Sequence, residues 1–250
     1  MPLGQNNSNL SDFKTLFKGR DFVYTSPSFQ REYVWHKSSK NVIPINDFIE
    51  SLEPFFSHDE EDKNYVFFIG NLLMRNYPLV NRDLDTGSPY LIIDGQQRLT
   101  SLYLVYLSLA NFSKMEALDA YHKSIKERVL DTNKKPKLIP TSFDRPTLNK
   151  IIKEIFDDAE VDETDRWNLT KTGIRKSFEI ICQKFDDMFD EALKNMDQDM
   201  LGNQGGEVPP NVRKHEAERL VRNFLLNFED RIWYSMVHIE EELDVNKVFD

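Results

Sequence analysis

The sequence contains a single cysteine, Cys182, in 250 residues, and it also lacks long apolar runs. One cysteine excludes an internal disulfide framework and any CxxC metal site. The longest apolar run, around 102–110, is shorter than the roughly 20 residues that cross a bilayer. The first residues lack the charged start and apolar stretch of a signal peptide. We therefore expect a cytoplasmic protein with no membrane segment.

The sequence also has fewer basic than acidic residues: 32 Lys and Arg against 42 Asp and Glu, which gives a net charge of −10. Non-specific binding to duplex DNA depends on basic side chains that neutralise phosphates. An acidic chain suits that task only where its basic residues gather in one cleft. Any contact with DNA is therefore expected to be local, or to be made by another domain.

The apolar pattern changes midway along the chain. In the first part, strand-like segments at 65–74 and 91–94 are expected to pair antiparallel, and a helix beginning near Arg98 follows them. In the second part, apolar residues recur at helical spacing. Helices are expected at 115–129, 148–155, 174–189 and 217–232, followed by a strand at 233–239. The sequence predicts an α+β fold, with a small mixed-sheet core in residues 1–112 and a mainly helical extension in 113–250.

A polar stretch, Asp94-Gly95-Gln96-Gln97-Arg98, separates an apolar strand from an apolar helix. The N-terminus of a helix presents unpaired N–H groups and a partial positive charge, so it attracts anions such as phosphate. Gly95 permits an unusual turn and the close approach of a ligand. Arg98 gains nothing from the helix dipole, and a bound anion would explain its position. Asp94 suits a divalent cation, a positioned water, or a ribose or base.

The same residues also suit a purely structural role. Asp94 would then be the helix N-cap, Gly95 a turn residue and Arg98 a surface ion partner. A turn motif of this length is not specific by itself, and the sequence has no Walker-type GxxxxGKS or GxxxxGKT motif. Residue chemistry alone leaves both interpretations open.

A second polar cluster, Gln30 and Arg31, lies between a strand-like FVY segment and the aromatic residues Tyr33 and Trp35. It repeats the Gln-Arg pair of the first stretch. Two arginines that converge on one cleft would suit a polyphosphate group. In the structural alternative, Arg31 pairs with an acid. The two aromatic residues are expected in the core.

Three segments occur in an order that resembles a known family: FQREYVW, then FFIGNLL, then IIDGQQRLTSLYLVYLSL. They are similar to the N-terminal domain of GmrSD-type restriction enzymes, which are prokaryotic anti-phage proteins with a ParB/sulfiredoxin-like core and a helical extension. These motifs cover about residues 27–110. The remainder resembles the family more loosely, through LIPTSFDRPTLNKII and WYSMVHIEEELDVNKVFD.

The resemblance implies that the DGQQR turn binds and hydrolyses a nucleoside triphosphate, ATP or GTP, to permit attack on modified foreign DNA. On this basis we hypothesise that the nucleotide binds with Mg²⁺, that Asp94, Gln97 and Arg98 are catalytic, and that Asp94 holds the metal. The other residues implied in nucleotide binding are Gln30, Arg31, Gly70, Asn71, Gly95 and Gln96.

Members of the family often end in a His-Asn-His nuclease domain, which this sequence does not contain. We therefore expect an N-terminal fragment that contacts DNA through a further domain or a partner. Two alternatives use the same residues: a ParB-like nuclease that nicks DNA, and a non-catalytic module that senses nucleotide or DNA.

Overall fold

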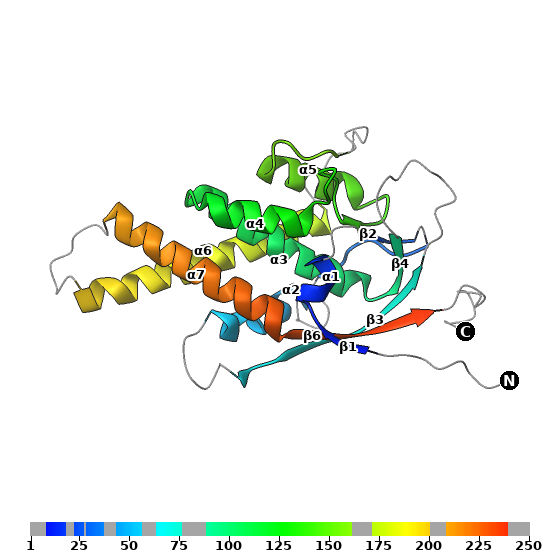
Figure 1. Ribbon diagram of the computed structural model, residues 1–250, viewed down its shortest axis with the longest axis horizontal. Helices are drawn as coiled ribbons and strands as arrows, with labels where there is room; N and C mark the ends of the chain where they lie inside the picture. Colours follow the sequence, from blue (N-terminus) through cyan, green and yellow to red (C-terminus); the bar gives the residue numbers. More distant parts are fainter. Residues whose placement is uncertain are drawn as a thin grey trace.

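The structure, a computed structural model, describes residues 9–18, 23–27, 29–37, 44–56, 64–76, 89–161, 172–200 and 209–239. Over these ranges the chain forms one mixed six-stranded sheet and seven α-helices, which confirms the predicted α+β class. The sheet lies at one end of the molecule, and two long helices reach away from it (Figure 1). The acidic segment 57–64, expected to be a solvated loop, and the segment 81–89, expected to be an exposed turn region, lie outside the described residues except for residues 64 and 89. The segment after 239 also lies outside them.

The strands come from both ends of the chain. They are β1 (Asn9–Asp12), β2 (Val23–Thr25), β3 (Phe67–Asn76), β4 (Pro89–Asp94), β5 (Leu138–Ile139) and β6 (Ile232–Ile239), in the sheet order β1-β6-β3-β4-β2-β5. The pair β3–β4 is antiparallel, as predicted. Strand β6 runs parallel to β3 and antiparallel to β1. The expected boundary between residues 112 and 113 stays a prediction about folding units, and the sheet itself takes strands from both sides of it.

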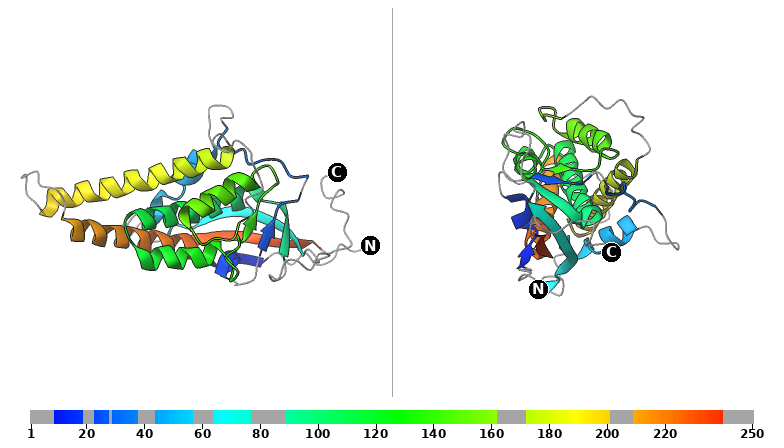
Figure 2. Two further views of the ribbon diagram at one scale, coloured as in Figure 1. Left: turned by 90° about the horizontal axis from the view of Figure 1, so that it is seen from above. Right: turned by 90° about the vertical axis from the view of Figure 1, so that its right-hand side faces the viewer.

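The helices follow the predicted apolar stripes closely. They are α1 (Lys14–Lys18), α2 (Pro44–Glu50), the short 3-10 helix η1 (Glu53–Phe55), α3 (Gln96–Met115), α4 (Asp119–Val129), α5 (Arg145–Ile155), α6 (Gly173–Met200) and α7 (Pro210–Arg231). The helix predicted at 115–129 has a wrong start, because α3 ends at Met115 and Ala117 has a positive φ of 54°. Helices α6 and α7 form the pair that extends from the sheet (Figures 1 and 2). Among the described residues, no helix has the length and apolar character needed to cross a bilayer.

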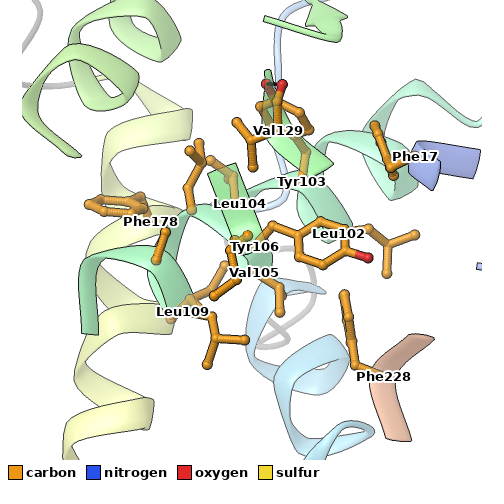
Figure 3. Packing of buried hydrophobic residues seen from close by; sticks show 14 of the residues in the cluster. Phe17, Leu102, Tyr103, Leu104, Val105, Tyr106, Leu109, Val129, Phe178 and Phe228 are labelled. Atoms are coloured by element: carbon orange, nitrogen blue, oxygen red, sulfur yellow. Dashed lines mark hydrogen bonds between the residues drawn. The ribbon is translucent and has the colours of Figure 1, made fainter. Parts of the chain in front are cut away.

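Helix α3 runs through the middle of the hydrophobic core. It is apolar on every side, which is typical of a helix enclosed by other elements, and Leu102, Leu104 and Val105 are all fully buried. Figure 3 shows these side chains among residues from α4, α6 and α7. The buried hydroxyl of Tyr103 has a hydrogen-bond partner, because it donates to the carbonyl of Val129 at 2.8 Å. Because α3 is packed on all sides, its first turn is held in a fixed place at the end of β4.

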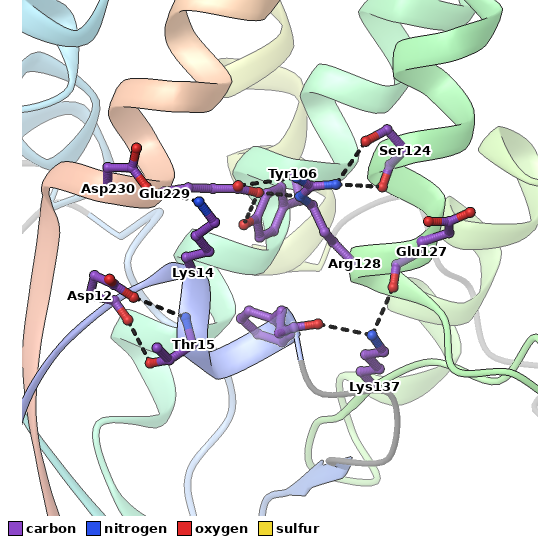
Figure 4. Close-up of polar contacts among 11 residues, drawn as sticks. Asp12, Lys14, Thr15, Tyr106, Ser124, Glu127, Arg128, Lys137, Glu229 and Asp230 are labelled. Carbon is purple, nitrogen blue, oxygen red and sulfur yellow. Dashed lines mark hydrogen bonds and ion pairs between the residues drawn. The ribbon is translucent and has the colours of Figure 1, made fainter.

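A buried polar cluster fixes α3 to α4 and α7 (Figure 4). Glu229 is 3% exposed, and its carboxylate accepts hydrogen bonds from Nε and Nη2 of Arg128. The Tyr106 hydroxyl donates to the same carboxylate at 3.1 Å. Burial raises the pKa of Tyr106 well above its usual value, and the charge of Glu229 adds to the shift. Nη1 of Arg128 also donates to the carbonyl and hydroxyl of Ser124, both at 2.8 Å.

Candidate functional site

The polar stretch Asp94–Arg98 forms a tight turn between β4 and the first turn of α3, which we call the elbow. Strand β4 ends at Asp94, and Gly95 is the N-cap of α3 with φ 96°, a left-handed conformation that favours glycine. A Cβ at this position would lie 2.4 Å from Cδ2 of Leu72. No side chain caps the helix, so the structural interpretation of Asp94 as the N-cap is wrong.

Arg98 lies across the elbow and contacts two strands. Its Nη2 donates to Oδ2 of Asp94 at 2.9 Å, and its Nη1 donates to the carbonyl of Ile69 at 3.2 Å. Gly70 has φ 97°, and a Cβ there would lie 2.4 Å from Nη1 of Arg98. Asn71 is also adjacent, since its carbonyl oxygen lies 3.4 Å from a Cβ built on Gly95. The structure therefore brings the predicted strand residues, Gly70 and Asn71, against the predicted elbow.

The Gln30–Arg31 loop, residues 29–37, packs against the same elbow. Gln30 Nε2 donates to the carbonyl of Ile93 at 2.6 Å, one residue before Asp94. The side-chain amide of Gln97 accepts from the N–H of Val34 at 2.8 Å and donates to the carbonyl of Glu32 at 3.1 Å. Both ends of this amide are occupied by the loop, so Gln97 holds the loop in place. Its predicted catalytic role stays a prediction.

Four further predicted residues have different surroundings. Arg31 is exposed, and no hydrogen bond or ion pair of its side chain occurs within the described residues, so the structural alternative of an acid partner finds no support there. Gln96 is 3% exposed, and neither atom of its amide has a hydrogen-bond partner among the described residues. Tyr33 is buried, as predicted, and Trp35 packs at the edge of the core. In this conformation the Gln96 amide faces protein, not solvent.

The electrostatics of the elbow combine one carboxylate with one guanidinium and a helix N-terminus. The Asp94 side chain is 59% exposed and that of Arg98 is 26% exposed. The described residues contain no group of three or more His, Cys, Asp or Glu that could hold a metal ion. Mg²⁺ is commonly held by one or two carboxylates together with substrate phosphates and water. The elbow therefore fits an ion that arrives with phosphates, and it does not fit a resident metal held by protein ligands alone.

Two residues at this site were missed from the sequence. Asp144, just before α5, accepts the N–H of Tyr33 through Oδ2 at 2.7 Å. Burial raises the pKa of this carboxyl, against the lowering effect of the hydrogen bond. Gly173, at the start of α6, is so close to the loop that a Cβ would lie 2.4 Å from the carbonyl oxygen of Tyr33. Neither residue lies near the loop in the sequence, and no local pattern marks them.

Comparison with known proteins agrees with the resemblance seen in the motifs. No curated protein matches the chain. The family model described as the N-terminal domain of GmrSD restriction endonucleases matches residues 13–250, which include every described element from α1 to β6. The ParB/sulfiredoxin-like character of the core stays a prediction. Because the match covers nearly the whole chain, the protein belongs to the GmrSD N-terminal domain family and is a component of a restriction system.

Proposed function

We propose that the elbow binds the phosphates of a nucleoside triphosphate, ATP or GTP, and that the domain hydrolyses it in the service of restriction. The observation that supports this most strongly is the position of Arg98 at the N-terminus of α3, with Gly70 leaving room beside its guanidinium. A guanidinium combined with a helix N-terminus is well suited to phosphate. The membership of the restriction family supports the same proposal.

The backbone of the elbow adds hydrogen-bond donors. The N–H of Leu99 is bonded to the carbonyl of Gly95 at 2.9 Å, so it closes the first turn of α3. The N–H groups of the residues before it have no partner within the helix. They carry the partial positive charge of the helix end. A phosphate at this end would interact with both the N–H groups and Arg98.

The ion pair of Arg98 with Asp94 does not prevent this role. Because the Asp94 side chain is 59% exposed, the pair is an exposed one. Such pairs contribute only about 0–1 kcal/mol, so a phosphate could replace the carboxylate at small cost. Asp94 would then be available to a Mg²⁺ ion that arrives with the nucleotide. The exposed Arg31, in the loop that packs on the elbow, would add a second positive charge.

Titration of the purified chain with ATP and GTP tests the proposal directly. We expect saturable binding that weakens when Mg²⁺ is removed by chelation, because the ion neutralises phosphate charge. We also expect release of inorganic phosphate at a rate that depends on Mg²⁺. Absence of binding for both nucleotides would contradict the proposal. Binding without phosphate release would favour the alternative of a non-catalytic sensing module.

The nuclease alternative needs a separate assay, since a phosphodiester would use the same acid and arginines. Supercoiled DNA incubated with the chain and a divalent metal should stay intact. Nicking that is lost in Asp94→Ala would favour the ParB-like nuclease instead. The net charge of −10 is a further reason to expect no nicking, because it disfavours binding to duplex DNA.

The substitution Gly70→Ala should weaken nucleotide binding without unfolding the domain. Alanine at φ 97° is strained by roughly 1–2 kcal/mol, and its Cβ would displace the end of the Arg98 side chain. We expect nucleotide affinity to fall about fivefold, equivalent to about 1 kcal/mol. Calorimetric titration and thermal unfolding of the variant give the two quantities.

The control for this prediction is the double variant Gly70→Ala/Arg98→Ala. If Gly70 acts by leaving room for Arg98, the alanine should cost no further affinity once the guanidinium is gone. Losses of affinity that add fully in the double variant would contradict this explanation.

A further inference from the structure

We propose that Asp144 is a positioning residue for the Gln30–Arg31 loop and, through this loop, for the nucleotide site. The second part rests on the proposed function, whereas the first part concerns the protein without nucleotide. Asp144 is fully buried and precedes α5, far along the chain from the loop.

The carboxylate of Asp144 is directed at the loop backbone. Its Oδ2 accepts the N–H of Tyr33 at 2.7 Å and the hydroxyl of Thr141 at 3.1 Å. A hydrogen bond from a backbone N–H to a carboxylate is stronger than one between neutral groups. Thr141 in turn is held close by backbone bonds, because its carbonyl accepts the N–H groups of Asp144 and Arg145 at 3.0 and 2.9 Å. The acceptor for the loop is therefore built into a rigid turn.

Asp144 does not serve the other purposes expected of a residue before a helix. Its side chain makes no capping hydrogen bond to α5. Its Oδ1 is buried with no hydrogen-bond partner among the described residues. A buried polar atom without a partner costs stability. The contact with the loop is thus the interaction that accounts for an acid at this position.

The loop is held from several sides, and Asp144 supplies the contact from α5. Helix α3 contributes Gln97 and also Ser101, whose Oγ lies 2.8 Å from the Tyr33 hydroxyl. Strand β4 accepts the Gln30 amide. Tyr33 is therefore fixed at its hydroxyl by α3 and at its N–H by Asp144. Arg31 lies two residues before this N–H, so release of the N–H would allow the arginine to shift. Small shifts of positioning groups have large effects on affinity and catalysis.

Hydrogen–deuterium exchange of the nucleotide-free protein tests the first part. In Asp144→Ala, peptides that cover residues 29–37 should exchange roughly tenfold faster. Asp144→Asn keeps an oxygen that accepts the N–H, so its exchange should stay near that of the wild type. The matched control is Asp157→Asn, which changes an acid whose side chain is 88% exposed and should leave the loop unaffected. Unchanged exchange in Asp144→Ala would overturn the proposal.

Nucleotide titration of the same variants tests the second part. We expect Asp144→Ala to lose affinity roughly tenfold, with Asp144→Asn and Asp157→Asn close to the wild type. Faster exchange with unchanged affinity would overturn the positioning role. If the wild type binds no nucleotide, the proposed function fails, and the exchange measurement still decides whether Asp144 holds the loop.

If Asp144→Ala does not fold, Thr141→Val provides a second test. This substitution removes the hydroxyl that orients the carboxylate, and it should change exchange and affinity in the same direction by a smaller factor. Wild-type behaviour of Thr141→Val in both measurements would then overturn the proposal.

Discussion

Arg98→Ala is expected to reduce the affinity for ATP or GTP about fiftyfold, with little change in stability. A charge-assisted hydrogen bond contributes about 1.5–3 kcal/mol, and fiftyfold corresponds to about 2.3 kcal/mol. The stability effect should be small because Arg98 pairs with an exposed carboxylate and donates weakly, at 3.2 Å, to the carbonyl of Ile69. Calorimetric titration measures the affinity, and thermal unfolding measures the stability.

Two controls distinguish a phosphate contact from a general effect of charge. Arg98→Lys keeps the charge and loses the planar fork of donors, so its affinity should fall between those of the wild type and Arg98→Ala. Arg222→Ala removes an exposed arginine on α7 and should leave nucleotide affinity unchanged. Equal affinity of the wild type and Arg98→Ala would remove the phosphate-binding role of the elbow.

Glu229→Ala should have the largest effect on stability, a loss of about 3–5 kcal/mol in the free energy of unfolding. The substitution removes a buried carboxylate and leaves the Arg128 guanidinium and the Tyr106 hydroxyl without their acceptor. The Arg128 side chain is only 25% exposed, and a mostly buried charge without a partner is costly because the protein interior solvates it poorly. Urea denaturation followed by circular dichroism measures the loss.

The double variant Arg128→Met/Glu229→Leu provides the control. Replacing both members of a buried ion pair by apolar residues is often neutral or stabilising, so the double variant should be more stable than Glu229→Ala. A cost below 1 kcal/mol for Glu229→Ala would contradict the assigned role of this cluster. The cluster meets α3 at Tyr106, about two helical turns beyond Arg98. Nucleotide affinity of the folded variant should therefore not change.

Much of the fold could be predicted from local patterns. Apolar residues of α5, α6 and α7 recur at the helical period because one face of each helix is buried in the core. The spacing in the sequence therefore predicts the helices. The stripe through α4 was located with a wrong start, because the apolar Met115 continues the spacing although it ends α3 and is 67% exposed. Spacing alone does not show where a chain turns.

The sheet order was not predictable in this way. Strand β6 reads as an ordinary strand, and nothing in its residues indicates that it lies between β1 and β3. The short strands β1 and β5, of four and two residues, were missed, because segments of that length carry no readable alternation. Their pairing depends on backbone hydrogen bonds to distant strands.

The residues of the elbow were predicted from the sequence, and they lie close together because they are neighbours along the chain. Asp94, Gly95 and Arg98 are local neighbours at a strand-to-helix junction, so their proximity follows from the chemistry of a single turn. The packing of the Gln30–Arg31 loop on this junction followed from the family resemblance and is seen in the contact of Gln30 with Ile93.

The sequence by itself determined the local elements: the apolar helices, the strand before the elbow and the turn that glycine permits. Only the tertiary structure decided that Gln97 holds a loop, that Gly70 leaves room for Arg98 and that Asp144 anchors Tyr33. The reason is physical. Local structure depends on residues within one or two turns of each other, whereas these contacts join segments more than 25 residues apart, and a side chain gains such a partner only after the core has packed.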